Sequence, residues 1–305
     1  METPWTFWAG FNFAIVVLLV LDFAVLDRVR RGPSVTESVV TTLVWVALAL
    51  CFGALLVLRE GWGKGSEFFT GYVIEYSLSV DNLFLFVLIF SNFRLPPEQQ
   101  RRLLFWGVIG ALVMRGVMIG AGTALLMRFE WITYVFGAYI LYAGVSMLAH
   151  KPAQEVEKMR IVRVARKVLP LTQGDHVGRF FLRENGRLRL TMLCLVLIVV
   201  ELTDLVFALD SIPAIFGVTR DPFIVYTSNV CAVLGLRSLY FALAGLVKSL
   251  VYLHLGLACI LMFIGAKMLG EHFFPIPTYV SLLVVGGILG TAIAASLLKA
   301  KSGKV

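Results

Sequence analysis

The chain has 305 residues, of which 59% are hydrophobic and 15% are charged. Soluble domains typically contain about 25% charged residues, so this composition excludes an ordinary soluble protein and indicates a chain that lies mostly in lipid. The net charge of +8 could indicate a nucleic-acid-binding protein, and the positions of Lys and Arg along the chain decide between that interpretation and membrane topology.

Apolar stretches of about 20 residues, the length that crosses the hydrocarbon core, follow one another along the chain. They are continuous rather than alternating, which favours helices over the strands of a barrel. We therefore predict an all-α, polytopic membrane protein with one transmembrane domain over residues 1–305. Residues 1–10 lack the basic region of a signal peptide, so the first stretch is expected to stay as an anchor. The nine predicted spans begin near Trp5, Thr36, Phe68, Leu103, Trp131, Leu190, Phe223, Leu250 and Thr278.

The positive charges predict an orientation. If the N-terminus lies outside, one set of connections contains twenty of the 27 Lys and Arg residues, and the other contains Arg59, Lys64, Arg128 and Arg220. The basic side is cytoplasmic by the positive-inside rule, which predicts an outside N-terminus and a cytoplasmic C-terminus and makes a nucleic-acid partner unnecessary. The basic segment 150–189 is interpreted as a solvated cytoplasmic loop that could also contact membrane lipid headgroups.

An internal repeat relates residues 68–149 to residues 190–270. Each copy contains three spans, an odd number, so the second copy would enter the membrane from the opposite side. Inverted repeats of this kind place the substrate near the bilayer midplane between the copies. The peripheral helices would be 5–26, 36–58 and 278–298. The matching features are Glu75 and Asp81, Arg115 and the run Gly-Val-Ser-Met-Leu from Gly144 in the first copy, against Asp204 and Asp210, Arg237 and the run Gly-Ala-Lys-Met-Leu from Gly265 in the second.

Acidic residues within the predicted spans are the main indication of function. Each costs on the order of 2.5–3.5 kcal/mol at the bilayer centre. Their pairing with Arg115, Arg237 and Lys267 could be purely structural, but three cations do not neutralise five carboxylates if all are ionised. A divalent cation would supply the missing positive charge, and protonation of one or two acids would also close the gap. We favour a cation pathway over a purely structural role in holding the helices together. The five acids are Glu75, Asp81, Glu201, Asp204 and Asp210.

The available donors narrow the choice of ion. Carboxylates and the amides of Asn82 and Asn229 are hard oxygen ligands, which suit manganese, magnesium or calcium better than copper or zinc. The four cysteines lie in apolar stretches and are interpreted as small core residues. No resident cofactor is expected apart from the transported ion.

Helical spacing indicates which acids can share a cavity. Glu201 and Asp204 project within about 60° of each other on a regular helix, so both can face one cavity. Asp81 and Asp210 form the natural pair across the repeats. The two acids of a pair six residues apart point about 120° apart, so a site shared by such a pair would require an unwound helix.

The basic residues within spans have two interpretations. Arg115 and Arg237 occupy matching positions, so each could fix the orientation and charge state of an acid, or act as a gate. We prefer the static counter-ion role. Lys267 lies near the end of a span and is expected to snorkel to the membrane surface.

Three runs of sequence resemble the TerC family, which includes the Alx-type proteins. They are Glu-Tyr-Ser-Leu-Ser-Val-Asp-Asn at 75–82, Glu-Leu-Thr-Asp-Leu-Val-Phe-Ala-Leu-Asp-Ser-Ile-Pro-Ala at 201–214, and residues 227–240, within a likeness that covers roughly 68–269. The resemblance implies a bacterial inner-membrane protein associated with manganese export, with metal supply to secreted enzymes and, by name, with tellurite resistance. It implies that transport depends on Asp81, Glu201, Asp204 and Asp210, and the same motifs include Glu75, Asn82, Asn229 and Arg237.

The favoured prediction is a secondary exporter of manganese or another divalent cation, with protons as the counter-ion. The chain lacks the Gly-x-x-x-x-Gly-Lys motif of ATP hydrolysis. An enzyme is not expected, because His-Glu-x-x-His and Gly-x-Ser-x-Gly motifs are also missing from the sequence. The alternative is a membrane interaction or stress-resistance protein without transport of its own, which docks envelope protein partners through residues 151–189.

Overall fold

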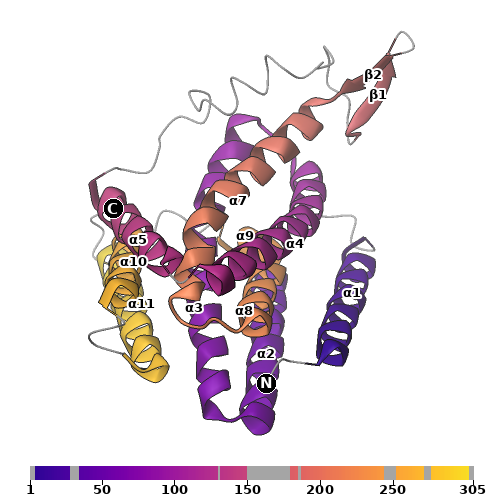
Figure 1. Ribbon diagram of the computed structural model, residues 1–305. Helices are drawn as coiled ribbons and strands as arrows, with labels where there is room; N and C mark the ends of the chain where they lie inside the picture. Colours follow the sequence, from indigo (N-terminus) through magenta and orange to yellow (C-terminus); the bar gives the residue numbers. More distant parts are fainter. Residues whose placement is uncertain are drawn as a thin grey trace.

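The protein is a helical bundle with a small β-hairpin at one end (Figure 1). The computed structural model describes residues 4–27, 34–129, 131–149, 179–184, 187–243, 252–270 and 276–301. The all-α prediction is confirmed for these residues. Their helices are α1 (Trp5–Asp27), α2 (Val35–Glu60), α3 (Trp62–Asn92), α4 (Pro97–Arg128), α5 (Ile132–Ala149), α7 (Met192–Phe216), α8 (Pro222–Leu234), α9 (Leu236–Leu243), α10 (Leu253–Gly270) and α11 (Thr278–Lys301).

Eight helical segments within the described ranges are long and apolar enough to cross a membrane, and α5 is a shorter apolar helix. The nine predicted spans correspond to these segments, although α3 and α4 each begin six residues earlier than predicted. Their first turns contain charged residues such as Lys64 and Glu98, so an apolar run locates the lipid-buried part of a helix and not its polar end. Gly61, with a φ of +88°, allows the sharp turn between α2 and α3.

The segment 150–189, predicted to be a loop, lies outside the described residues over 150–178 but ends in a hairpin. Strands β1 (Phe181–Glu184) and β2 (Arg187–Leu190) pair antiparallel, with Phe181 opposite Leu190. The sequence had a signal for this structure. Residues 187–190 alternate charged and apolar side chains after Asn185-Gly186, and Asn-Gly is the preferred pair for a two-residue hairpin turn. The sequence analysis interpreted this segment as a solvated loop and did not predict the hairpin.

The helices that carry the paired acids are continuous. α3 runs through Glu75 and Asp81 without interruption, and α7 runs through Asp204 and Asp210. Pro213 lies near the C-terminal end of α7, where the loss of one N–H donor affects only the last turn. The break that the structure does contain falls elsewhere, at Gly235 between α8 and α9, which together form the predicted seventh span.

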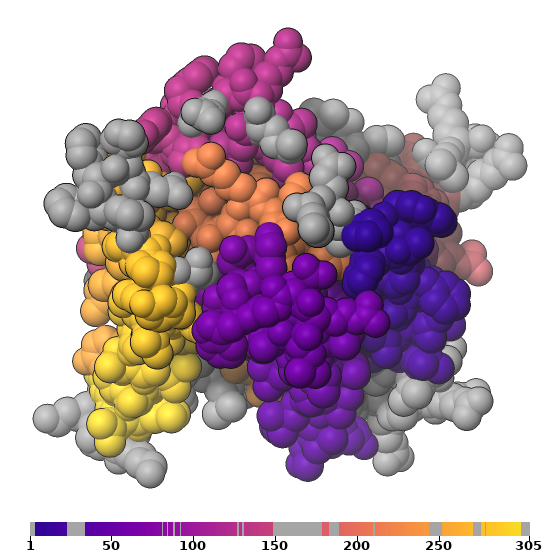
Figure 2. Space-filling model, turned by 60° about the horizontal axis from the view of Figure 1, so that its bottom comes forward, coloured from indigo at the N-terminus to yellow at the C-terminus, as the bar shows by residue number. Residues whose placement is uncertain are grey.

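Each helix of one predicted repeat packs mainly against a helix of the other. α3 packs mainly against α8, α4 against α7, and α5 against α10. If α3, α4 and α5 correspond to α7, α8–α9 and α10, these are the pairings of a two-fold arrangement. Figure 2 shows α1 and α11 on opposite sides of the molecule, with α2 and α3 between them. The outer helices therefore flank a central core.

Two glycines make reciprocal contacts at the interface between α5 and α10. In an isologous interface, residue i of one copy contacts residue j of the other, and the reverse contact recurs. The partners of Gly144 are three and seven residues before Gly265, and the partners of Gly265 are three and seven residues before Gly144. A Cβ at Gly144 would lie 2.9 Å from Met262 N and 3.0 Å from Ala258 O, and a Cβ at Gly265 would lie 2.6 Å from Leu141 N and 2.8 Å from Gly137 O. This symmetry agrees with a repeat, while the direction of each membrane crossing stays a prediction.

Candidate functional site

A buried guanidinium joins four helices at the centre of the bundle. Arg115 of α4, whose side chain is 1% exposed, forms ion pairs with Glu75 of α3 and Asp204 of α7. It donates two hydrogen bonds to Asp204, from Nη2 to Oδ1 at 3.1 Å and from Nε to Oδ2 at 3.3 Å. Such a two-pronged contact fixes both side chains more firmly than a point charge could. Arg115 therefore lies as a counter-ion to two of the predicted acids, and the choice between a static role and a gate stays a prediction.

Neutral groups complete the hydrogen bonding of Glu75. Asn229 of α8 is fully buried, donates from Nδ2 to Glu75 Oε2 at 3.0 Å, and accepts from Arg115 Nη1 at 3.2 Å. Ser79, one turn further along α3, donates to Glu75 Oε1 at 3.2 Å. Both oxygens of this carboxylate are thus occupied, as buried charges require. Asn229 acts as an orienting amide between an acid and its counter-ion.

Glu201 differs from the other described acids of the core. Its Oε2 atom is buried and has no hydrogen-bond partner among the described residues. Glu201 and Asp204 line the same pocket, which is the geometry that their spacing on α7 predicts. Gly107 of α4 lines the same pocket, and Gly110, one turn further along α4, lies directly against the Glu201 carboxylate. A Cβ at Gly110 would overlap both carboxylate oxygens of Glu201, so this glycine makes room for the acid.

The charges of this central cluster do not balance. Three carboxylates, those of Glu75, Glu201 and Asp204, stand against the guanidinium of Arg115. If all are ionised, two negative charges are left over, which equals the charge of one divalent cation. Glu201 is only partly buried, but its buried Oε2 atom has no partner among the described residues, and such an atom is costly if charged, so a cation or a proton at Glu201 would lower this cost.

The second arginine does not repeat the role of the first. Arg237 of α9 lines the same pocket but forms its ion pair with Asp22 of α1. Asp22 was missed by the sequence analysis, although it is an acid near the end of the first predicted span. The peripheral helix α1 therefore supplies a counter-ion to the second repeat, in addition to packing against α8 through Trp8, Phe223 and Tyr226.

The remaining predicted residues are only partly placed. The side chains of Asp81 and Asp210 lie outside the described part of the structure, so their predicted pairing stays a prediction. Asn82 is buried on α3 but is not a hydrogen-bond partner of Arg115 or Glu75. Lys267 was expected to snorkel, and this prediction was wrong. It is only 8% exposed, because it lies on the side of α10 that faces the bundle.

Within the described side chains, no group of three or more His, Cys, Asp or Glu residues gathers closely enough to hold a metal ion. The positions of the acids explain this. Glu75 and Asp204 are both turned toward Arg115, while Glu201 faces Gly110 across the pocket. A cation coordinated here would need a rearrangement of these side chains or ligands from the undescribed ones.

The comparisons with known proteins point to one family. Residues 60–304 match the integral membrane protein TerC family. The chain is 47% identical over 294 residues to the putative membrane-bound redox modulator Alx of Escherichia coli (strain K12), which covers 92% of this chain and 91% of that protein. It is 46% identical over 295 residues to an uncharacterized membrane protein of Myxococcus xanthus, covering 96% and 92%. It is 37% identical over 294 residues to one of Rickettsia felis, covering 96% and 97%. No solved structure matches the chain.

Proposed function

The chain belongs to the TerC family of integral membrane proteins, and from this premise we propose that it exports a divalent metal cation, with manganese as the favoured ion, from the cytoplasm in exchange for protons. The proposed location is a bacterial inner membrane, consistent with the basic connections expected on the cytoplasmic side. The family and the apolar helices establish a multi-pass membrane protein; the cargo, the direction and the counter-ion are the proposal.

The observation that carries this proposal is the uncompensated carboxylate of Glu201. Its buried oxygen without a partner lies beside Asp204 on the wall of a pocket between helices of the two predicted repeats. Buried polar atoms in native proteins are normally satisfied, so an orphaned carboxylate oxygen in a pocket is a reasonable first contact for a cation. The Arg115 cluster behind it would prevent the site from accumulating more negative charge than one divalent ion neutralises.

The donor chemistry supports the choice of ion. Carboxylate and amide oxygens prefer manganese, magnesium and calcium to softer metals. Carboxylates bind metal only when deprotonated, so binding of the cation and release of protons are linked. The same residues could therefore carry metal outward and protons inward in alternation, which is the basis of the exchange that we propose.

Transport by the purified protein tests the proposal. The protein is reconstituted into proteoliposomes that contain a manganese-sensitive dye, and manganese entry is followed with and without a pH gradient. We expect transport above the rate of empty liposomes, stimulated by the gradient.

Glu201→Gln should lower the initial rate at least tenfold, the effect of losing about 1.4 kcal/mol of interaction. Glu60→Gln, which removes an exposed carboxylate at the end of α2, should leave the rate unchanged. Wild-type rates equal to those of empty liposomes would rule out the exporter.

A second variant tests the alternative function, which is docking of envelope proteins through the basic segment 151–189 without transport. If that segment is replaced with a neutral linker, the exporter should still move manganese at the wild-type rate. If neither form moves manganese, and the biological effect of the protein depends on the segment, the protein would instead be an interaction protein.

A further inference from the structure

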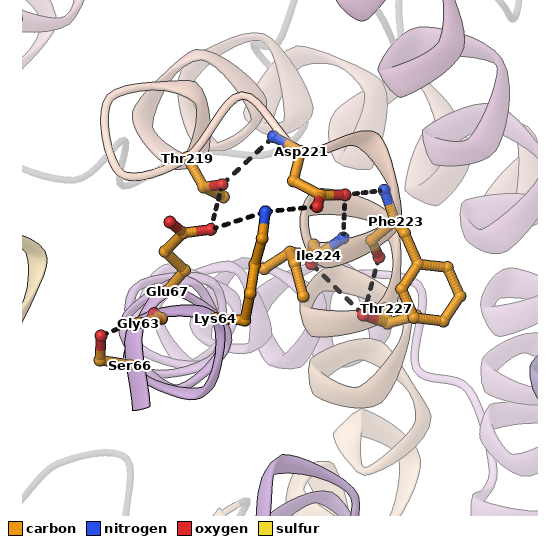
Figure 3. Close-up of polar contacts among 9 residues, drawn as sticks. All are labelled: Gly63, Lys64, Ser66, Glu67, Thr219, Asp221, Phe223, Ile224 and Thr227. Carbon is orange, nitrogen blue, oxygen red and sulfur yellow. Dashed lines mark hydrogen bonds and ion pairs between the residues drawn. The ribbon is translucent and has the colours of Figure 1, made fainter. Parts of the chain in front are cut away.

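At the end of the bundle opposite the hairpin, polar side chains join α3 to the connection between α7 and α8 (Figure 3). Lys64, in the first turn of α3, donates to Asp221 Oδ2 at 2.5 Å and lies 3.7 Å from Glu67 Oε2. Thr219 donates to the same Glu67 oxygen at 2.6 Å. These four residues, Lys64, Glu67, Thr219 and Asp221, are called the latch below. They tie the first turns of α3, just before the first predicted repeat, to the connection between α7 and α8 within the second.

Asp221 makes the latch part of the helix framework. Its Oδ1 atom accepts from the backbone N–H groups of Phe223 at 3.0 Å and Ile224 at 3.4 Å and so caps the N-terminus of α8. Its other oxygen binds Lys64. Because one carboxylate serves both contacts, α8 cannot tilt away from the start of α3 without breaking the ion pair.

The helices are tightly packed directly behind the latch. Thr70 of α3, Ile215 of α7 and Ser228 of α8 are all fully buried. Gly71 allows the closest approach, since a Cβ at this position would lie 2.8 Å from Ser228 Oγ. A larger side chain at Gly71 would have to displace the Ser228 hydroxyl, so α3 and α8 are in close contact between the latch and Asn229.

The other halves of the same helices enclose the pocket. Its lining residues include Phe86 near the C-terminal end of α3, Leu104 near the start of α4, Val200 near the start of α7 and Leu236 at the start of α9. These positions lie toward the hairpin end. One set of helices is thus closely packed at the latch and encloses a small pocket in its other half, which is the asymmetry expected of a transporter that opens to one side at a time.

We propose that the latch is a gate of the transport path, and that the pair between Lys64 and Asp221 must break for the cation to leave at this end. The inference rests on the proposed function. The exposure of the pair suits a gate: the Lys64 side chain is 37% exposed and that of Asp221 is 16% exposed. Partly exposed ion pairs are weak, so this one can open in each cycle, unlike the fully buried pairs of Arg115.

Accessibility of a cysteine behind the latch tests the gate. Ser228→Cys is introduced after the four native cysteines are replaced, and an impermeant methanethiosulfonate reagent is applied from the latch side. Lys64→Gln should raise the labelling rate about tenfold. Lys64→Arg, which retains the charge, should change it less than twofold. Arg59→Gln removes an exposed cation in the last turn of α2, near Lys64 in sequence but outside the latch, and should also have less than a twofold effect.

An unchanged labelling rate in Lys64→Gln, or an equal increase in Arg59→Gln, would overturn the proposal. Gel filtration shows which variants are folded. If Lys64→Gln is not folded, the labelling rate of Asp221→Asn is measured instead and judged in the same way. The amide oxygen of Asn can still cap α8, while the charge is lost. Labelling does not require transport, so the two proposals fail separately. A latch-dependent increase without manganese flux in the wild-type protein would reject the cargo and keep the gate.

Discussion

Arg115 distributes its donors over three helices, and this explains why Glu201 is left without a counter-ion. Its guanidinium contacts Glu75, Asp204 and Asn229, which uses its fork fully. A lysine at this position would offer a point charge with no fixed geometry. Since Arg115 already serves two carboxylates and Arg237, in the same pocket, pairs with Asp22, no described arginine forms an ion pair with Glu201, and under the proposed function its charge would be neutralised by the transported ion.

Gly110 provides the space for Glu201, and Gly110→Ala is expected to impair transport without unfolding the protein. The added Cβ would overlap the Glu201 carboxylate, which is the end of a flexible side chain and can move aside. Stability should change by less than about 1 kcal/mol, because alanine also favours the helix. Displacement of the carboxylate from the pocket should lower the manganese transport rate about tenfold, measured in proteoliposomes.

Gly120→Ala is the matched control on the same helix, because a Cβ at Gly120 meets open space. It should transport manganese at the wild-type rate and unfold at the same or a slightly higher temperature. Equal loss of transport in both variants would mean that the effect comes from α4 as a whole and not from the position of Glu201.

The sequence identified which residue types would lie in the core, but it identified their partners only in part. Glu75, Arg115 and Asp204 stand out because charge is rare within apolar spans. The pairing of Arg237 with Asp22 could not be predicted, since it depends on where α1 packs, a contact between residues 215 positions apart. The latch was likewise missed, because Lys64 and Asp221 lie in polar helix ends where charges are ordinary.

At the scale of helices, the α5–α10 interface depends on close approach of two backbones. A Cβ at Gly265 would lie 2.6 Å from Leu141 N, and backbone cannot move aside as a side chain can. We therefore expect Gly265→Ala to destabilise the protein by about 1–3 kcal/mol through overpacking. Thermal unfolding of the protein in detergent measures this as a lower midpoint temperature.

Gly270→Ala tests whether the effect is specific to the interface. Gly270 is the last residue of α10 and has nothing within 4 Å of a Cβ position. The same substitution there should leave the midpoint unchanged or raise it. If Gly265→Ala is as stable as the wild-type protein, the two helices can separate without cost and the close packing has no structural role.

Helices were easier to predict than their interruptions. Long apolar runs in lipid must form helices because each backbone polar group needs an internal partner, and nearly every predicted span has a helix in the structure. The hairpin at 181–190 was missed because a basic segment between spans was interpreted by charge alone. The break at Gly235 was missed because glycine is tolerated in membrane helices and only packing decides where a helix yields.

At the scale of the whole molecule, observations at two different sets of helix interfaces agree with each other. The reciprocal glycine contacts of α5 and α10 are those of a two-fold relation, and α3 and α4 exchange partners with α7 and α8 in the same sense. The two ends of the bundle depart from this symmetry, since an ion pair joins α3 to Asp221 at one end and the pocket lies toward the other, which is in keeping with the proposed transport. A symmetric scaffold held in an asymmetric state is the basis of alternating access.

The orientation of the chain decides which compartment each end faces. The distribution of Lys and Arg predicts that the C-terminus is cytoplasmic and that Gly61, between α2 and α3, is outside. Green fluorescent protein fused after residue 305 should therefore fluoresce, and alkaline phosphatase fused there should be inactive. After residue 61 the two reporters should behave in the opposite way. With this orientation the half of the bundle that contains the pocket faces the cytoplasm and the latch faces outward, as the proposed export requires. Reversed reporter activities would place the pocket outside, and the same structure would then describe a protein poised to take up its cation.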